Sequence, residues 1–148
     1  MTTVYESIAV WLTEIFNERS NGFPTGITVI DLEAIPAQTE FPGMNLSGIF
    51  SSPNDIHTPL IGGQEKHTEF KSFYFRRNFM TTQTRMANEA FFDLLRNVIR
   101  KYNLDYIMPK DGRDWISITI NGGIYPAQRQ ENNAFADYLI PLRLEYQQ

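Results

Sequence analysis

Residues 135–146 read FADYLIPLRLEY, and the fold follows from this stretch. Apolar or aromatic residues occupy every even-numbered position in it: Ala136, Tyr138, Ile140, Leu142, Leu144 and Tyr146. Because successive side chains of a strand point to opposite faces, this strict alternation predicts a long β-strand with one buried face. The opposite face carries Phe135, Leu139 and Arg143.

Pro141 lies inside this predicted strand. Proline has no N–H to donate, so within sheets it is confined mostly to edge strands and bulges. The sequence therefore predicts that 135–146 is an edge strand. A long edge strand is a template for pairing with another chain unless something covers it, which points to assembly rather than to chemistry.

Apolar residues at helical spacing predict two amphipathic helices, at about 3–19 and about 84–102. The first is expected to start at Thr2 or Thr3 and to end at Ser20-Asn21-Gly22. Alternating or β-branched stretches predict further strands at 27–32, 44–50, 68–79, 115–120 and 124–130. The expected fold class is α+β, with an antiparallel or mixed β-sheet and two helices in the order α-β-β-β-α-β-β-β.

A chain of 148 residues is expected to form one domain. We expect its last three strands to form an antiparallel meander, with a hairpin turn at Asn121-Gly122-Gly123. A long segment, 33–66, contains four prolines and four glycines: Pro36, Pro42, Pro53, Pro59, Gly43, Gly48, Gly62 and Gly63. Apart from the strand at 44–50, we interpret it as a loop. Loops of this length are usually functional, so 33–66 is predicted to be a projecting arm.

Composition excludes several classes of protein. The formal net charge of -4 argues against sequence-independent binding of nucleic acid, which needs a basic surface. The absence of cysteine excludes disulfide scaffolds, thiolate zinc sites and cysteine nucleophiles. The first residues carry two glutamates and no basic lead-in, which is not typical of a signal peptide. No apolar run is long enough for a membrane helix, so we expect a cytoplasmic location.

The two histidines, His57 and His67, are candidate metal ligands together with Asp55, Glu65 or Glu69. Their spacing matches no standard metal motif, so we predict no metal site and expect solvated histidines. Asp111-Gly112-Arg113-Asp114 resembles a fragment of a calcium loop, but the downstream ligands of an EF-hand are missing. We interpret this tetrapeptide as a turn before the strand at 115–120.

No arrangement of serine, histidine and acid indicates a catalytic nucleophile. Gly62-Gly63 lacks the lysine and the following helix that a phosphate-binding loop needs. The sequence therefore predicts no enzyme and no cofactor. Arg76-Arg77, at the end of an aromatic strand, is the most notable charged feature. The planar guanidinium suits interface ion pairs and phosphate contacts, and a solvated strand end is the alternative.

Several pieces of the chain stand in a recognisable order. They are an amphipathic helix (5–16), Ile35-Pro36, the run Phe73-Tyr74-Phe75-Arg76-Arg77, a helix (87–95), Ile124-Tyr125-Pro126 and the last strand (138–146). This order resembles the minor capsid and tail-completion proteins of tailed bacteriophages, the group that includes tail terminators. The resemblance implies a virion protein of the tail or neck, present in the host cytoplasm during assembly.

What the resemblance implies is a structural role without catalysis. Such proteins form a homo-oligomeric ring, commonly a hexamer, that ends the tail tube and docks it to the head connector. DNA passes through the lumen without sequence-specific binding, and no membrane is involved. We expect the interface to include nine residues: Arg76, Arg77, Phe135, Leu139, Arg143, Ile56, His57, Leu60 and Ile61. The alternative is a monomeric adaptor that recognises a protein partner through 33–66.

Overall fold

A computed structural model describes the backbone of residues 3–23, 28–31, 46–51, 55–78, 82–123, 125–128 and 135–148. Side chains are described within 3–23, 55–72, 89–123 and 139–148. The elements in chain order are α1 (Val4–Asn17), the 3₁₀ turn η1 (Arg19–Asn21), β1 (Thr28–Asp31), β2 (Leu46–Ser51), β3 (Ile56–Pro59), β4 (Glu65–Asn78), α2 (Thr82–Leu104), β5 (Asp114–Ile120), β6 (Tyr125–Gln128) and β7 (Phe135–Gln147).

The α+β class, the two helices and a mixed sheet are confirmed, but the predicted order of elements is wrong. Four strands precede α2, because β3 lies within the segment predicted as loop. The same segment also contains β2 and the first residues of β4. The proline and glycine content of 33–66 misled the prediction, because Gly62 and Gly63 serve a turn between two strands. Residues 33–45 and 52–54 of this region lie outside the described residues.

Helix α1 begins where the sequence predicted. The hydroxyl of Thr3 accepts a hydrogen bond from the Glu6 N–H at 3.2 Å, and the Thr3 N–H donates to the Glu6 carboxylate at 3.0 Å. This reciprocal capping box satisfies two of the N–H groups that a helix start leaves free. After η1, Gly22 takes a left-handed conformation with φ of 81°, which ends the helical segment.

Strands β4 and β7 form the long antiparallel centre of the sheet, paired from Lys66↔Gln147 to Asn78↔Phe135. Two shorter strands, β2 and β3, pair with successive parts of β4 on its other side. Two more, β5 and β6, pair with successive parts of β7. Strand β1 extends the sheet by pairing parallel to β2. The predicted edge strand is therefore wrong: β7 is central.

Pro141 is tolerated in a central strand because of where its missing N–H falls. The Asn121 N–H donates to the Pro141 carbonyl at 2.7 Å. In an antiparallel ladder both backbone groups of a residue face the same neighbour, so the missing N–H also faces the segment after β5. Pairing of β5 with β7 ends at Leu142 and pairing of β6 begins at Leu139. Pro141 thus lies where the ladder is already interrupted.

The predicted meander is also wrong in its pairing. Strands β5 and β6 both run antiparallel to β7 and flank the same side of it. They therefore run in the same direction, and the segment between them does not form the expected hairpin. Gly122, with φ of 94°, provides the left-handed position that this irregular connection uses.

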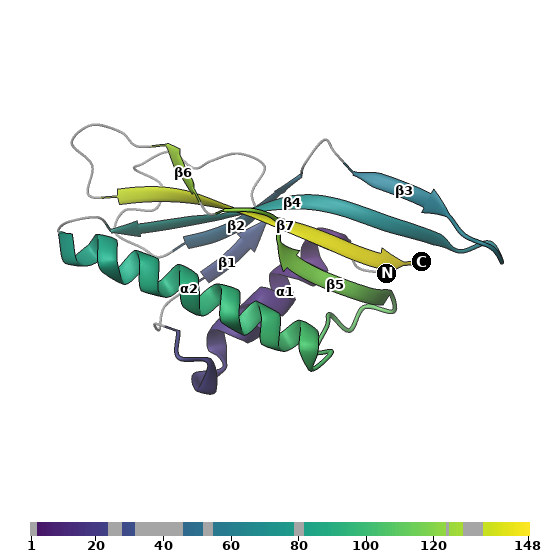
Figure 1. Cartoon of the computed structure of the whole chain (residues 1–148), viewed down its shortest axis with the longest axis horizontal. Helices are drawn as coiled ribbons and strands as arrows, with labels where there is room; N and C mark the ends of the chain where they lie inside the picture. The colour runs from purple at the N-terminus through teal and green to yellow at the C-terminus, as the bar shows by residue number, and fades with distance from the viewer. Residues whose placement is uncertain are drawn as a thin grey trace.

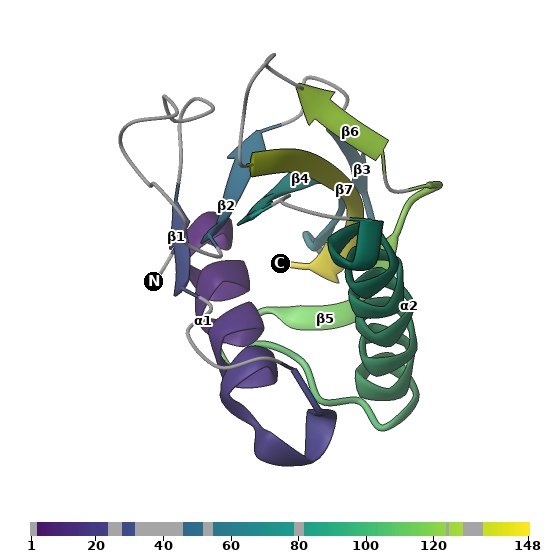
Figure 2. The ribbon, with the colours of Figure 1, turned by 90° about the vertical axis from the view of Figure 1, so that its left-hand side faces the viewer.

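Both helices cover one face of the curved sheet, and the core lies between these layers (Figures 1 and 2). The predicted alternation of β7 is confirmed, because Ile140, Leu142, Leu144 and Tyr146 are all buried. They meet the apolar stripe of α1, with Ile8, Trp11, Leu12, Ile15 and Phe16, and that of α2, with Phe91, Phe92, Leu95, Val98 and Ile99. None of the described helices is long and apolar enough to cross a membrane.

Candidate functional site

The predicted interface residues fall at different places along the β4–β7 pair. At one end, Arg76 is opposite Asp137, Arg77 is opposite Ala136, and Phe135 is opposite Asn78. The structure thus brings Arg76, Arg77 and Phe135 together along the backbone; their side chains lie outside the described ones. At about 3.3 Å per strand residue, Arg77 is roughly 33 Å from His67 in the β3–β4 hairpin.

Leu139 and Arg143 lie between these ends. In β7 they alternate with the buried residues, so they point to the face of the sheet away from the helices. Leu139 is half-buried and Arg143 is exposed, with its guanidinium donating to the Glu145 carboxylate at 2.7 Å. A short surface ion pair of this kind adds little stability, which leaves Arg143 accessible to another molecule.

The other predicted interface residues, from the segment interpreted as loop, lie at the opposite end of the molecule, where β3 turns into β4 (Figure 1). The Leu60 N–H donates to the Gln64 carbonyl at 2.8 Å, and the turn between them uses Gly62 and Gly63 at positive φ. Ile56 is exposed and Ile61 is fully exposed at the turn. We call Ile56, Leu60 and Ile61 the hairpin tip.

A second exposed apolar surface was not predicted from the sequence. It lies on the connection between α2 and β5 and on the adjoining side of α1, and comprises Val10, Leu104, Tyr106 and Ile107. We call these four residues the connection surface. The Trp11 indole N–H donates to the Ile107 carbonyl at 2.8 Å, and the Tyr106 hydroxyl donates to the Trp115 carbonyl at 2.7 Å. These bonds hold the connection against α1 and β5.

The turn predicted at 111–114 is confirmed for 111–113, while Asp114 already belongs to β5; the acid that begins the turn, Asp111, has a structural role. Asp111 accepts hydrogen bonds from the Trp115 indole at 2.9 Å, the Arg113 N–H at 3.0 Å and the Arg113 guanidinium at 2.7 Å. Burial by itself would raise the pKa of Asp111, but these bonds and one from Ser7 together lower it below the ordinary value. The carboxylate therefore holds the start of β5 in place.

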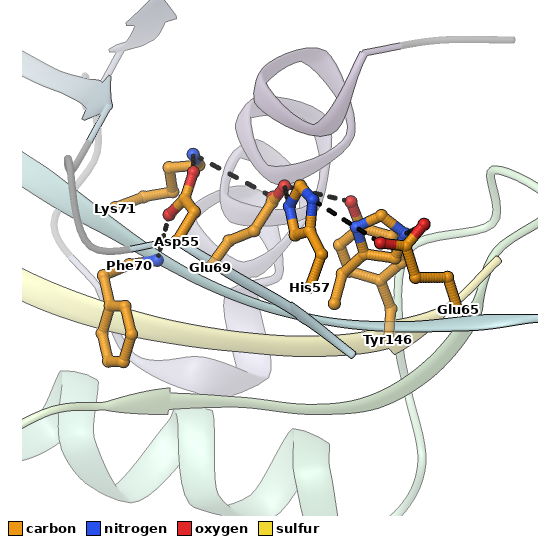
Figure 3. A network of polar contacts seen from close by, with 8 residues as sticks. Asp55, His57, Glu65, Glu69, Phe70, Lys71 and Tyr146 are labelled. Carbon is orange, nitrogen blue, oxygen red and sulfur yellow. Dashed lines mark hydrogen bonds and ion pairs between the residues drawn. The ribbon is translucent and has the colours of Figure 1, made fainter. Parts of the chain in front are cut away.

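A buried charged network lies on the helix-facing side of β4 (Figure 3). Lys71 is opposite Leu142 and Glu69 is opposite Leu144, so both share a face with the core residues of β7. The Lys71 side chain is only 5% exposed, and its ammonium lies 3.0 Å from the Asp55 carboxylate and 4.0 Å from that of Glu69. Asp55 also accepts from the Phe70 N–H at 2.9 Å.

Tyr146 joins this network to the core. Its hydroxyl donates to Glu69 at 3.2 Å. Burial raises the pKa of Tyr146 strongly, and the neighbouring negative charge and hydrogen bond of Glu69 add to that rise. The phenol is therefore a neutral donor throughout the physiological range.

The expectation of solvated histidines is wrong for His67. His57 and His67 are direct partners across β3 and β4, and their ring centroids are 4.3 Å apart. The His67 side chain is 13% exposed and stacks on Tyr146 at 4.7 Å. Sequence spacing missed this pairing because the nine residues between the histidines form a hairpin, and the spacing alone does not show its register.

Comparison of the chain with protein-family models and with curated proteins gives no match in either case.

Proposed function

We propose that the protein is a virion structural component that forms a closed ring at the head–tail junction of a tailed bacteriophage. The ring would end the tail tube and dock it to the head connector. The observation that carries this proposal is that six of the seven exposed large apolar side chains among the described residues belong to the hairpin tip or the connection surface, and Ile116 on β5 is the exception. The resemblance of the sequence to tail-completion proteins is the reason for placing the proposed ring at the head–tail junction.

Two separate surfaces suit a cyclic ring. Each subunit of such a ring contacts its two neighbours through different surfaces that must match each other. In the proposed contact, the fully exposed Ile61 of one subunit packs on Tyr106 and Ile107 of the next. Burying one isoleucine side chain stabilises a contact by about 1.5–3 kcal/mol, and a ring repeats that contact at every interface.

At the outer edges of β3 and β5, side-chain packing suits a contact with another subunit better than continuous strand pairing does. The Leu60 N–H faces β4, so by alternation Pro59 faces outward and offers no N–H on the outer edge of β3. On the outer edge of β5, Ile118 is already bonded to Asn103, and the Trp115 carbonyl to Tyr106. Both edges are therefore poor templates for another strand.

The partners follow from this role. One face of the ring would match the last ring of tail-tube protein, and the other would refuse further tube subunits and meet the head connector. Arg76, Arg77 and Phe135, at the far end of the sheet, are proposed to take part in one of these axial contacts. The net charge of -4 suits a lumen through which DNA passes without sequence-specific binding. The role needs no membrane and no catalysis.

The test is the mass of the purified chain in solution, measured by light scattering after size exclusion across a concentration series. We expect a species of about six subunits, which Ile61→Asp shifts to monomer because a charge cannot be buried in an apolar contact. Asn97→Asp is the matched control. It adds the same charge on the exposed side of α2, outside both surfaces, and should leave the mass unchanged.

A ring that closes only on its partner would appear as a monomer in this measurement. A pull-down with tail-tube protein then decides the question, with Ile61→Asp and Asn97→Asp again compared. A chain that stays monomeric and does not bind tail-tube protein would contradict the proposal. That result would favour the monomeric adaptor that acts through 33–66.

A further inference from the structure

The β3–β4 hairpin gathers three side chains of metal-binding type beside the buried network. His57 lies on β3, directly opposite His67 on β4. Glu65 precedes His67 by two residues, so both point to the same face of β4. One donor atom from each of His57, Glu65 and His67 lies within 4.8 Å of the others. The register of the hairpin therefore creates this cluster.

The distances within the cluster suit a shared cation better than hydrogen bonds. Glu65 presents one carboxylate oxygen to each imidazole: Oε1 lies 3.8 Å from His57 Nδ1, and Oε2 lies 3.8 Å from His67 Nε2. Both separations exceed the 2.7–3.2 Å of a hydrogen bond by a wide margin. Nitrogen and oxygen ligands about 2.0–2.2 Å from one tetrahedral zinc ion are roughly 3.3–3.5 Å apart. The three donor atoms, which lie within 4.8 Å of one another, would reach that separation through rotation of their side chains toward a common ion.

The surroundings orient both imidazoles. The His67 ring stacks parallel to the Tyr146 ring, with an angle of 2° between their planes. The remaining nitrogen of His57, Nε2, lies 3.7 Å from Glu69 Oε1, the same oxygen that accepts the Tyr146 hydroxyl. This separation is too long for a hydrogen bond, but a rotation that brings Glu69 within reach of Nε2 would fix the tautomer of His57 and strengthen it as a ligand.

The charge and exposure of the cluster also suit a cation. Lys71, the nearest cationic side chain of the network, is held by Asp55 at 3.0 Å, while Glu65 and Glu69 lie beside the imidazoles (Figure 3). The side chains of His57 and Glu65 are 47% and 44% exposed, so an ion can enter from solvent and water can complete its coordination. Two imidazoles with one carboxylate form a ligand set that suits zinc, whereas magnesium and calcium prefer oxygen ligands alone.

We propose that His57, Glu65 and His67 bind one divalent transition metal ion of the zinc class, with Glu69 supporting His57. Such an ion would tie β3 to β4 and stiffen the hairpin that carries Ile61. The metal site stands on its own distances and does not depend on the proposed ring. Binding of the ion would therefore control how rigid the β3–β4 hairpin is.

The chain contains only two histidines and no cysteine, so no other histidine or cysteine competes for the added metal ion. Protein without a histidine tag is treated with a chelator and titrated near neutral pH with Zn²⁺ in a calorimeter, and with Co²⁺ in an absorption spectrometer. We expect saturable binding of one ion per chain and a visible Co²⁺ spectrum. Wild-type imidazole proton signals in an NMR spectrum should shift for both histidines at the same Zn²⁺ ratio.

The variants His57→Gln and Glu65→Gln each remove one ligand at a half-exposed position, so the fold should persist. Each should weaken Zn²⁺ binding by more than the roughly 10–100-fold typical of losing an outer partner, and Glu69→Gln should fall within that range. The matched controls are Thr58→Gln, on the neighbouring position of β3, and Glu89→Gln, an exposed acid on α2; neither should change binding.

Three results would overturn the proposal. One is the absence of saturable Zn²⁺ binding to the wild-type chain. Another is binding that His57→Gln and Glu65→Gln leave unchanged. The third is a Zn²⁺-dependent shift of only one histidine in the NMR spectrum, because the geometry requires both rings to bind the same ion.

Discussion

The side-chain amide of Asn103 pairs with both backbone groups of Ile118. Its Nδ2 donates to the Ile118 carbonyl at 2.6 Å, and its Oδ1 accepts from the Ile118 N–H at 2.8 Å. Asn103 lies near the end of α2, and Ile118 lies in β5, with its backbone groups facing away from β7. The amide thus makes the hydrogen bonds that a neighbouring strand would make at Ile118. It therefore protects this edge of β5 from pairing with another strand.

Replacing this amide should both destabilise the chain and open the edge. Asn103→Ala removes the two bonds to Ile118 and a third to the Ile99 carbonyl at 2.7 Å. We expect the free energy of unfolding to fall by about 2–3 kcal/mol, since each net hydrogen bond contributes about 0.5–1.5 kcal/mol. Urea denaturation measures the loss, and aggregation at rising concentration reports the opened edge.

The control for this variant is Asn97→Ala, at an exposed position of α2 about 1.7 turns earlier. A loss no greater than that of the control would mean that Asn103 does not support β5. Unchanged solubility together with a large loss of stability would mean that the amide holds the fold but does not guard the edge.

Two similar side-chain and backbone contacts fill gaps along the central strands. Asp55 accepts from the Phe70 N–H between the parts of β4 that pair with β3 and with β2. The Asn121 N–H reaches the Pro141 carbonyl between the parts of β7 that pair with β5 and with β6. The two long strands are therefore each flanked by a pair of short ones, and polar groups bridge the breaks.

This arrangement explains which predictions from the sequence succeed. The alternation in 135–146 is a local property of one strand, so it correctly predicts which face of β7 is buried. The neighbours of a strand are set by distant parts of the chain, so Pro141 alone could not show that β7 is central. The prediction of the two helices also succeeds, because the capping box at Thr3 and the apolar stripes are local signals in the sequence.

The candidate sites show the same limit. Exposure of Ile61 follows from Gly62 and Gly63, a turn signal visible in the sequence. Pairing of His57 with His67 depends on the register of the β3–β4 hairpin, which was interpreted as loop. The connection surface depends on how Trp11 holds Ile107, two residues that lie far apart in the sequence. Only the packed chain reveals the last two features.

The buried ion pair of the network should respond unequally to loss of its two partners. Asp55→Asn leaves the Lys71 ammonium buried with Glu69 at 4.0 Å as its remaining anion, and weakens the acceptor for the Phe70 N–H. We expect a loss of about 3–5 kcal/mol in the free energy of unfolding. Lys71→Met keeps the shape of the stem and removes the charge, so its loss should be smaller.

A double-mutant cycle with Asp55→Asn and Lys71→Met separates the interaction of the two side chains from their individual effects. The double variant should lose less stability than the sum of the single variants, because no unpaired ammonium remains. Strict additivity would show that the 3.0 Å contact between Lys71 and Asp55 contributes nothing to stability.

Arg77 tests the axial contact of the proposed ring. Arg77→Glu should weaken assembly onto tail-tube protein, because a guanidinium that binds an acidic partner becomes a repelling carboxylate. Binding in a pull-down at low and moderate salt measures the effect. Arg96→Glu, with the same reversal of charge on the exposed side of α2, is the control. Normal assembly of Arg77→Glu would remove this residue from the interface.

The lowered pKa of Asp111 predicts how stability depends on pH. A carboxyl whose pKa is lower in the folded chain contributes stability above its unfolded pKa, about 3.9, and loses it as the pH falls through the folded pKa. The wild-type chain should therefore lose stability on acidification below about pH 4. Asp111→Asn removes the charged acceptor of the Trp115 and Arg113 bonds and should cost about 1.5–3 kcal/mol near neutral pH.

Urea denaturation of both chains at neutral pH and at a series of acidic pH values checks this prediction. The difference in stability between wild type and Asp111→Asn should shrink as the pH falls, because protonation deprives the wild-type chain of the same charged contacts. Asp105→Asn, at an exposed acid in the same connection, is the control and should change the free energy of unfolding little. A difference for Asp111→Asn that stays constant with pH would mean that the carboxylate charge is unimportant and that Asp111 holds β5 by shape alone.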